Sequence, residues 1–127
     1  MKVIDNEHTV FVDVDGTLVL PYDTNYDIVK VKDPVTGNYL KFRPHHAMIR
    51  LLIEEAARGS YIVVWSRGGN QWARAVIEGL MLESHVDVVM TKPMVYFDDV
   101  DIKEWLPYRV FFEPGYNYKQ DIEQKRK

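Results

Sequence analysis

Hydrophobic residues along this chain fall into short continuous runs separated by polar turns. The first two runs are residues 9–14 (TVFVDV) and residues 61–65 (YIVVW). Both are rich in β-branched and aromatic residues and both stop at a turn signal, which favours strands over helices. Shorter runs at residues 86–90, 95–97 and 110–112 have the same character. Because the runs are continuous rather than alternating, they predict buried strands of a parallel sheet.

Between these runs the apolar residues recur at helical spacing. Pro44 suits the first turn of a helix, where its missing N–H is harmless, and Gly59 suits a helix end. A second helix is predicted from Asn70 to about Leu82. Strands that alternate with helices imply a parallel sheet with right-handed crossovers, so the sequence predicts an α/β fold. The apolar stripe of the first helix would consist of Met48, Ile49, Leu51, Leu52, Ile53 and Ala56.

Two segments depart from this alternation. Residues 26–42 (YDIVKVKDPVTGNYLKF) contain two short alternating stretches joined by a turn at residues 33–38, which predicts an inserted β-hairpin. An isolated hairpin is marginal in water, so we expect this one either to cover a site or to mediate self-association. The polar tail at about residues 116–127 is predicted to be a solvated helix or a frayed end.

Length and charge narrow the classes of protein. A chain of 127 residues has room for one domain with one core. Its 16 basic and 19 acidic residues give a net charge of −3, which is unsuited to coating nucleic acid but compatible with a small anionic substrate. The absence of cysteine excludes disulfides, thiolate metal sites and a cysteine nucleophile. With neither a signal peptide nor a long apolar span, we expect a soluble, cytoplasmic protein that does not contact membranes.

The residues with the most chemical content follow the first run. Asp13 and Asp15 would point to opposite faces if the strand continued, but Gly16 allows a turn that brings both carboxylates to one site. In an open α/β sheet, ligands bind beyond the carboxyl ends of the strands, which is where these residues fall. A strand that simply ends in an Asp-Gly turn has the same sequence. A calcium loop is excluded, because no further acidic ligands follow at the required spacing.

Other strand ends carry complementary groups. Ser66, Arg67 and Gly68 follow the second run and open a helix, a typical phosphate cradle, although a plain helix cap looks similar. Lys92 follows the third run and the pair Asp98-Asp99 follows the fourth. Each is ordinary alone. Their joint placement at strand ends indicates one site.

This order of residues resembles the haloacid dehalogenase superfamily, in particular its small phosphatases without a cap domain. The resemblance is carried by Asp13-x-Asp15-Gly16-Thr17, Ser66, Lys92 and Asp98-Asp99, and it extends over about residues 8–112. It implies a single catalytic domain over residues 1–127. That domain would be a Rossmann-like parallel sheet flanked by helices, with the β-hairpin inserted after the first strand.

The same resemblance implies a role for each residue. Asp13 would attack phosphorus and form an aspartyl-phosphate, while Asp15 would protonate the leaving oxygen and later activate water. Asp98 and Asp99 would bind Mg²⁺ together with the Asp13 carboxylate and the Asp15 backbone carbonyl. Such a cation offsets the repulsion between a carboxylate and a phosphate dianion. The residues expected to bind the phosphate or the substrate are Thr17, Ser66, Arg67, Gly68 and Lys92.

The predicted function is therefore hydrolysis of a small phosphomonoester with Mg²⁺ as cofactor. Action on a nucleotide or a nucleic-acid 3′ end is an alternative that the net charge disfavours. A binding module that kept the fold and lost the chemistry is a second alternative, which the complete set of motif residues argues against. The aromatic residues Tyr22, Tyr39, Trp65 and Trp72 are assigned to the core in preference to a stacking surface for a base.

Overall fold

The computed structural model describes residues 8–106, 108–113 and 117–122, with side chains described as far as residue 110. The chain divides into two compact units, Met1–Lys92 and Pro93–Lys127. Nearly all the predicted site residues belong to the first unit, and Asp98 and Asp99 belong to the second. Among the described residues, no helix is both long and apolar enough to cross a membrane.

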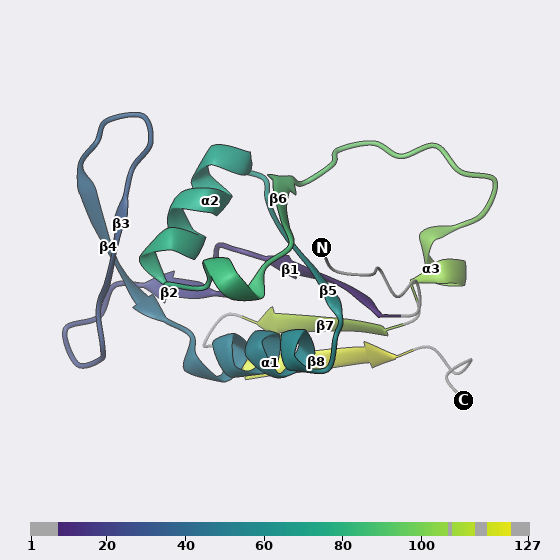
Figure 1. The fold of residues 1–127 in the computed structure, drawn as a ribbon. Helices are drawn as coiled ribbons and strands as arrows, with labels where there is room; N and C mark the ends of the chain where they lie inside the picture. The colour runs from purple at the N-terminus through teal and green to yellow at the C-terminus, as the bar shows by residue number, and fades with distance from the viewer. Residues whose placement is uncertain (1–7, 107, 114–116, 123–127) are drawn as a thin grey trace. The chain divides into compact units, whose positions relative to one another are not determined.

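A parallel three-stranded sheet lies at the centre of the first unit. Its strands are β1 (Thr9–Asp13), β5 (Tyr61–Ser66) and β6 (Val88–Thr91), in the order β1-β5-β6 (Figure 1). The register places Asp13 beside Trp65 and Ser66 beside Thr91. The first three predicted strands and their parallel pairing are confirmed, and their carboxyl ends share one edge.

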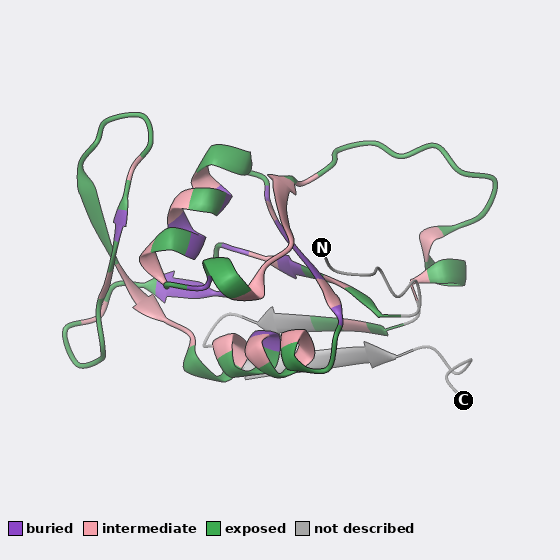
Figure 2. Cartoon of the chain, in the orientation of Figure 1, coloured by how far each residue is buried: buried purple, intermediate pink, exposed green. Residues whose placement is uncertain are grey.

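Two helices pack their apolar sides into one core with this sheet. They are α1 (His46–Ala57) and α2 (Asn70–Gly79), and a short helix η1 (Glu83–His85) follows the second. Figure 2 shows the buried positions along the sheet and on the inner sides of both helices. Each buried Val or Leu side chain contributes about 1.5–3 kcal/mol to folding. The most deeply buried members of this core are Val14, Leu18, Val19, Val31, Leu52, Ile62, Val64, Ala73 and Val76.

The expected position of Pro44 is wrong. Pro44 is the last residue of β4 and pairs with Val19 instead of opening the helix, which begins at His46. A proline is tolerated at a strand end for the same reason as at a helix start, since its missing N–H is not needed there. The local sequence therefore does not distinguish a proline at a strand end from one in the first turn of a helix.

The inserted hairpin is confirmed and belongs to a larger sheet. Strands β3 (Val29–Lys32) and β4 (Tyr39–Pro44) pair antiparallel, and β2 (Val19–Pro21) pairs with the other edge of β4. Val31 is fully buried, and a side chain at Gly79 of α2 would come within 3.0 Å of the Lys30 carbonyl oxygen. The hairpin thus has its packing partner in α2.

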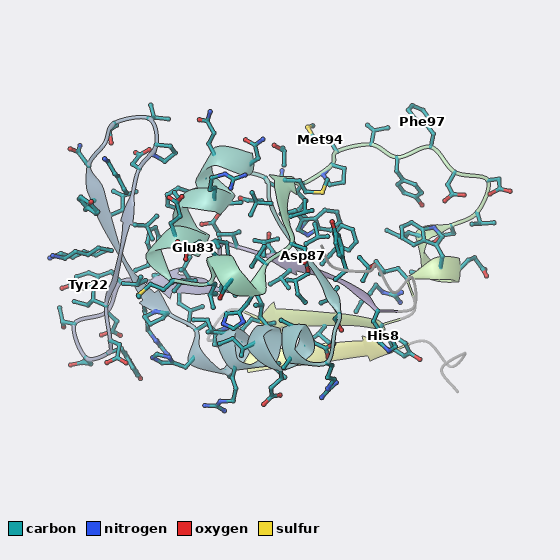
Figure 3. All side chains as sticks on the ribbon, viewed as in Figure 1. His8, Tyr22, Glu83, Asp87, Met94 and Phe97 are labelled. Atoms are coloured by element: carbon teal, nitrogen blue, oxygen red, sulfur yellow. The ribbon has the colours of Figure 1, made fainter. Side chains whose placement is uncertain are left out.

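The second unit contains α3 (Ile102–Trp105) and the antiparallel pair β7 (Tyr108–Glu113) and β8 (Asn117–Ile122). The strand predicted at residues 110–112 lies within β7. The strand predicted at residues 95–97 is wrong, because this stretch has no ladder partner among the described residues and its side chains are exposed. Figure 3 shows Met94 and Phe97 on this extended loop, and Phe97 is 96% exposed.

The prediction for the polar tail is also wrong over residues 117–122, which form β8. Backbone hydrogen bonds to β7 stabilise this strand. Most residues of the segment have little intrinsic strand preference, so the sequence alone does not predict it. The rest of the tail, residues 116 and 123–127, lies outside the described residues.

Candidate active site

The end of β1 is shaped by a tight turn. The amides of Thr17 and Leu18 donate to the Val14 carbonyl at 3.1 and 2.9 Å, and the amide of Gly16 donates to the Val19 carbonyl at 2.9 Å. Gly16 has φ +79°, a left-handed conformation that strains residues with a Cβ. The chain therefore turns at Gly16, as the sequence predicts.

The Asp13 carboxylate is held at both oxygens. The Thr17 hydroxyl donates to Oδ2 at 3.3 Å, and Lys92 Nζ lies 3.9 Å from Oδ1. The side chains of Asp13 and Lys92 are 34% and 36% exposed. An ion pair with this exposure contributes at most about 1 kcal/mol to stability. This ion pair therefore adds little to the stability of the fold.

Lys92 is brought to Asp13 by the sheet. Its amide donates to the Ser66 carbonyl at 2.8 Å, which continues the β5–β6 ladder by one step. Its ammonium also lies 5.9 Å from the centre of the Trp65 ring, within the range of a cation–π contact. The parallel pairing of three strands thus brings Asp13, Ser66 and Lys92 together.

Ser66 is the most buried of the predicted site residues, at 1% exposure. Its hydroxyl oxygen accepts from the Gly68 amide at 2.9 Å, so the hydroxyl proton is available to a ligand oxygen. The next two backbone amides also donate hydrogen bonds within the protein. Gly69 donates to the Ser66 carbonyl at 3.1 Å, and Asn70 donates to the Thr91 hydroxyl at 3.1 Å. The loop amides hold the shape of the turn that presents this hydroxyl.

Gly68 provides space in this turn. A Cβ at Gly68 would lie 3.0 Å from Cδ1 of Trp72 and 3.3 Å from the Ser66 hydroxyl. Its neighbour Arg67 is exposed on the same turn. Both residues therefore lie on the turn that follows Ser66, and substrate binding by them stays a prediction.

Trp72 contacts Asp15 and was missed as a site residue. Its Nε1 lies 3.2 Å from each carboxylate oxygen of Asp15. The half-buried Trp72 ring packs against the core, as the sequence predicts, and its centroid lies 5.7 Å from that of the Phe42 ring. The same core prediction is wrong for Tyr22 and Tyr39, which are exposed. An indole near the start of a helix that opens onto a site was the available signal, since a buried indole N–H usually finds an acceptor.

Asp98 and Asp99 belong to the second unit, and both are exposed. The Asp98 carboxylate accepts from the amides of Asp99 and Val100 at 2.7 and 3.2 Å. A side-chain hydrogen bond from Asp99, followed by that from the Val100 amide, holds the pKa of the Asp98 carboxyl below its usual range. Asp98 is therefore an ionised oxygen donor at neutral pH.

No three His, Cys, Asp or Glu side chains of the described residues come together as a metal site. The chemistry of the donors fits Mg²⁺ nonetheless, since carboxylate and carbonyl oxygens are the ligands that this ion prefers. Metal binding by Asp13, Asp15, Asp98 and Asp99 stays a prediction.

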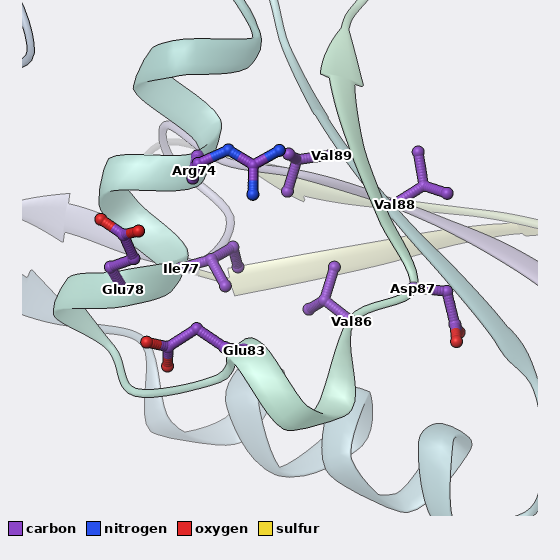
Figure 4. Close-up of a pocket in the computed structure, with 8 residues that line it drawn as sticks. All are labelled: Arg74, Ile77, Glu78, Glu83, Val86, Asp87, Val88 and Val89. Atoms are coloured by element: carbon purple, nitrogen blue, oxygen red, sulfur yellow. The ribbon is translucent and has the colours of Figure 1, made fainter. Parts of the chain in front are cut away.

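Two of the hollows among the described residues lie in the first unit. One of about 320 Å³ lies between α2 and the amino end of β6, away from the carboxyl edge, and Figure 4 shows the residues that line it. The other, of about 370 Å³, is lined partly by Tyr26, Arg43 and His45 at the base of the hairpin sheet. His45 Nδ1 donates to the Thr17 carbonyl at 2.7 Å, so this second hollow adjoins the turn that carries Asp15.

Comparison with known proteins confirms the resemblance inferred from the motifs. A family model described as NLI interacting factor-like phosphatase matches residues 8–105. The match spans most of the chain and includes Asp13, Ser66, Lys92 and Asp98. No curated protein and no solved structure gives a significant match.

Proposed function

The chain belongs to the NLI interacting factor-like phosphatase family, and on that premise we propose that this phosphatase hydrolyses phosphomonoesters through an aspartyl-phosphate on Asp13. The observation that carries the proposal is the pair of contacts on the Asp13 carboxylate. Thr17 binds one oxygen and Lys92 lies beside the other, at the edge of the sheet where the buried Ser66 hydroxyl lies.

In the first step, a carboxylate oxygen of Asp13 attacks phosphorus and the bond from phosphorus to the leaving oxygen breaks. Asp15 gives its proton to the leaving oxygen. In the second step, Asp15 takes a proton from water, whose oxygen attacks phosphorus and breaks the bond to Asp13. Free phosphate leaves, and both carboxyl groups return to their starting states.

Lys92 and Ser66 would stabilise the phosphoryl oxygens during both steps. A preformed donor that faces developing charge contributes more in the transition state than in the ground state. Lys92 serves as a point charge and Ser66 as a hydrogen-bond donor, the same division found in other phosphoryl-transfer sites. Thr17 would keep Asp13 in its attacking orientation.

We also propose that Mg²⁺ is the cofactor, held by the carboxylates of Asp13 and Asp98 and the backbone carbonyl of Asp15, with Asp99 beside them. The exposed Asp98 carboxylate supports the proposal, because carboxylate oxygens are the ligands that this hard cation prefers. When bound, Mg²⁺ would neutralise phosphoryl charge that would otherwise repel Asp13.

Small phosphomonoesters are the proposed substrates, because a net charge of −3 offers no general attraction to a polyanion. A nucleotide or a nucleic-acid 3′-phosphate is the second candidate, supported by the hollow beside Tyr26 and Arg43, whose guanidinium lies 3.7 Å from the centre of the Tyr26 ring. That stacked pair offers a flat, positively charged surface to a base.

Phosphate release from a panel tests the proposal. Phosphorylated sugars, nucleoside monophosphates and a 3′-phosphorylated oligonucleotide are compared with and without Mg²⁺. We expect sugar phosphates to be hydrolysed fastest and chelation to abolish turnover. The proposal fails if no monoester is hydrolysed with Mg²⁺ present, and preference for the oligonucleotide would select the second candidate.

Self-association through the hairpin and a cytoplasmic location are further proposals from the sequence. Sizing the wild type and a variant with a shortened turn at residues 33–38 tests the first. If the hairpin mediates self-association instead of covering the site, the wild type should be an oligomer that the shortening disrupts. Equal monomers in both samples would contradict it.

A further inference from the structure

The hydrogen bond between Trp72 and Asp15 joins residues 57 positions apart in the chain. Since the indole nitrogen is equally distant from both carboxylate oxygens, it faces the whole carboxylate group. We propose that Trp72 is a positioning residue that holds the Asp15 side chain in its proton-transferring orientation. The inference rests on the proposed function in that Asp15 is the acid and base.

The Trp72 ring is itself fixed from two sides. It is the third residue of α2, and its ring contacts Phe42 of β4 at a centroid distance of 5.7 Å. On another side, the backbone of Gly68 approaches so closely that a Cβ there would lie 3.0 Å from the indole Cδ1. A ring held in this way keeps its N–H in one direction.

Asp15, in contrast, has little else to orient it. It is exposed and follows the end of β1, and among the described residues both hydrogen bonds to its carboxylate come from this one N–H. A general acid must lie within about 2.6–3.2 Å of the atom that takes its proton. Asp13 has two separate groups, Thr17 and Lys92, for the same purpose.

The chemistry of the indole suits this task. Its nitrogen donates and never accepts, so it cannot take a proton from Asp15 or compete with the leaving oxygen as a base. The bond also leaves the second lone pair of each carboxylate oxygen accessible. Trp72 therefore orients Asp15 without taking part in the proton transfer.

An indole N–H spectrum tests the contact independently of activity. The chain has three Trp residues, so a ¹⁵N-labelled sample should give three indole signals, and Trp72→Phe identifies one by its loss. We expect Asp15→Asn to shift the Trp72 signal well beyond those of Trp65 and Trp105. An unmoved Trp72 signal would overturn the proposal. Because this readout needs no substrate, it is informative even if the proposed function fails.

Turnover of two monoesters tests the catalytic consequence. An alkyl phosphate needs an acid for its poor leaving group, whereas 4-nitrophenyl phosphate does not. We expect Trp72→Phe to lower kcat about ten-fold on the alkyl ester and at most about two-fold on the aryl ester, with little change in KM. The double variant Asp15→Asn, Trp72→Phe should have the same kcat on the alkyl ester as Asp15→Asn alone, because Trp72 acts through Asp15.

Trp105→Phe is the matched control, because it makes the same substitution at an indole of the second unit. It should leave the turnover of both esters close to that of the wild type. The proposal is overturned if Trp72→Phe also lowers both esters equally, or if its effect multiplies with that of Asp15→Asn. Should Trp72→Phe fail to fold, Trp65→Phe and Trp105→Phe assign the Trp72 signal by elimination, and its shift in Asp15→Asn still tests the contact.

Discussion

The carboxyl edge of the parallel sheet and the loop around Asp98 carry similar motif residues in different surroundings. At the sheet edge, Ser66 is buried, and Lys92 is tied to it by a backbone hydrogen bond of 2.8 Å. In the loop, Asp98 is exposed and bonds only to its next two neighbours in the chain among the described residues. Motif residues at the ends of strands that pair with one another are therefore held close together. Those in the unpaired loop contact only their sequence neighbours among the described residues.

Asp13→Asn should have the largest effect at the sheet edge. It removes the nucleophile, so we expect kcat to fall by about 10³ or more, as when a covalent nucleophile is lost in other enzymes. The measurement is steady-state phosphate release, with circular dichroism to show that the fold persists. Activity equal to that of the wild type would remove Asp13 from the chemistry.

Lys92→Ala should come next. Loss of the ammonium 3.9 Å from Asp13 removes a donor to the phosphoryl oxygens, and we expect a loss of about 10²-fold in kcat. Lys92→Arg keeps the charge and should recover part of the rate. If the two variants are equally active, the charge of Lys92 is not what matters.

Asp98→Asn tests whether the loop contributes to Mg²⁺ binding, in contrast to the proposed chemistry at the sheet edge. If Asp98 is a Mg²⁺ ligand, the half-saturating Mg²⁺ concentration should rise about ten-fold, and excess Mg²⁺ should restore much of the rate. Asp13→Asn should not respond to excess Mg²⁺. A wild-type Mg²⁺ dependence in Asp98→Asn would exclude the loop from the metal site.

Gly68→Ala tests the packing behind the site. The added Cβ would lie 3.0 Å from the Trp72 ring, and such overpacking costs about 1–3 kcal/mol. We expect a lower Tm in thermal unfolding followed by circular dichroism. Ala57→Gly at the exposed end of α1 is the comparison variant, because it lowers stability only through the small helix preference of glycine. An unchanged Tm in Gly68→Ala would contradict the close approach.

The smallest expected effect is at the hairpin turn. The Asp33 carboxylate accepts from the Val35 amide at 2.9 Å and from the Thr36 hydroxyl, which lowers the pKa of Asp33. A lowered folded-state pKa stabilises the fold above the unfolded value of about 3.9, and this contribution is lost as pH falls through the folded value. The Tm difference between the wild type and Asp33→Asn should therefore be largest near neutral pH and shrink toward about pH 3. A constant difference would mean that charge plays no part.

The parts of the fold that sequence predicts are those with a strong local pattern. The runs at residues 9–14 and 61–65 are continuous stretches of β-branched and aromatic residues that stop at turn signals. The hairpin at residues 26–42 has two alternating stretches joined by a turn. The strand at residues 95–97 was wrong and β8 was missed, because pairing decides whether a short stretch becomes a strand. Pro44 was misplaced because strand ends and helix starts tolerate proline for the same reason.

The candidate site divides in the same way. Asp13, Ser66 and Lys92 were predictable because parallel strands of one sheet end at a common edge. The contact of Trp72 with Asp15 was not, since the acceptor of an indole N–H is decided by packing of the helix on the sheet. The sequence also did not predict that the backbone amides of residues 68–70 donate to groups of the protein itself.

By itself, the sequence determined the α/β class, the order of the motif residues and the kind of chemistry they support, because side-chain type and local periodicity are written in the chain. The tertiary structure decided which groups meet: Thr17 and Lys92 on Asp13, and Trp72 on Asp15. The physical reason is that hydrogen bonds and close packing act over a few ångströms in space. Residues far apart in sequence reach that distance only after the strands and helices have packed.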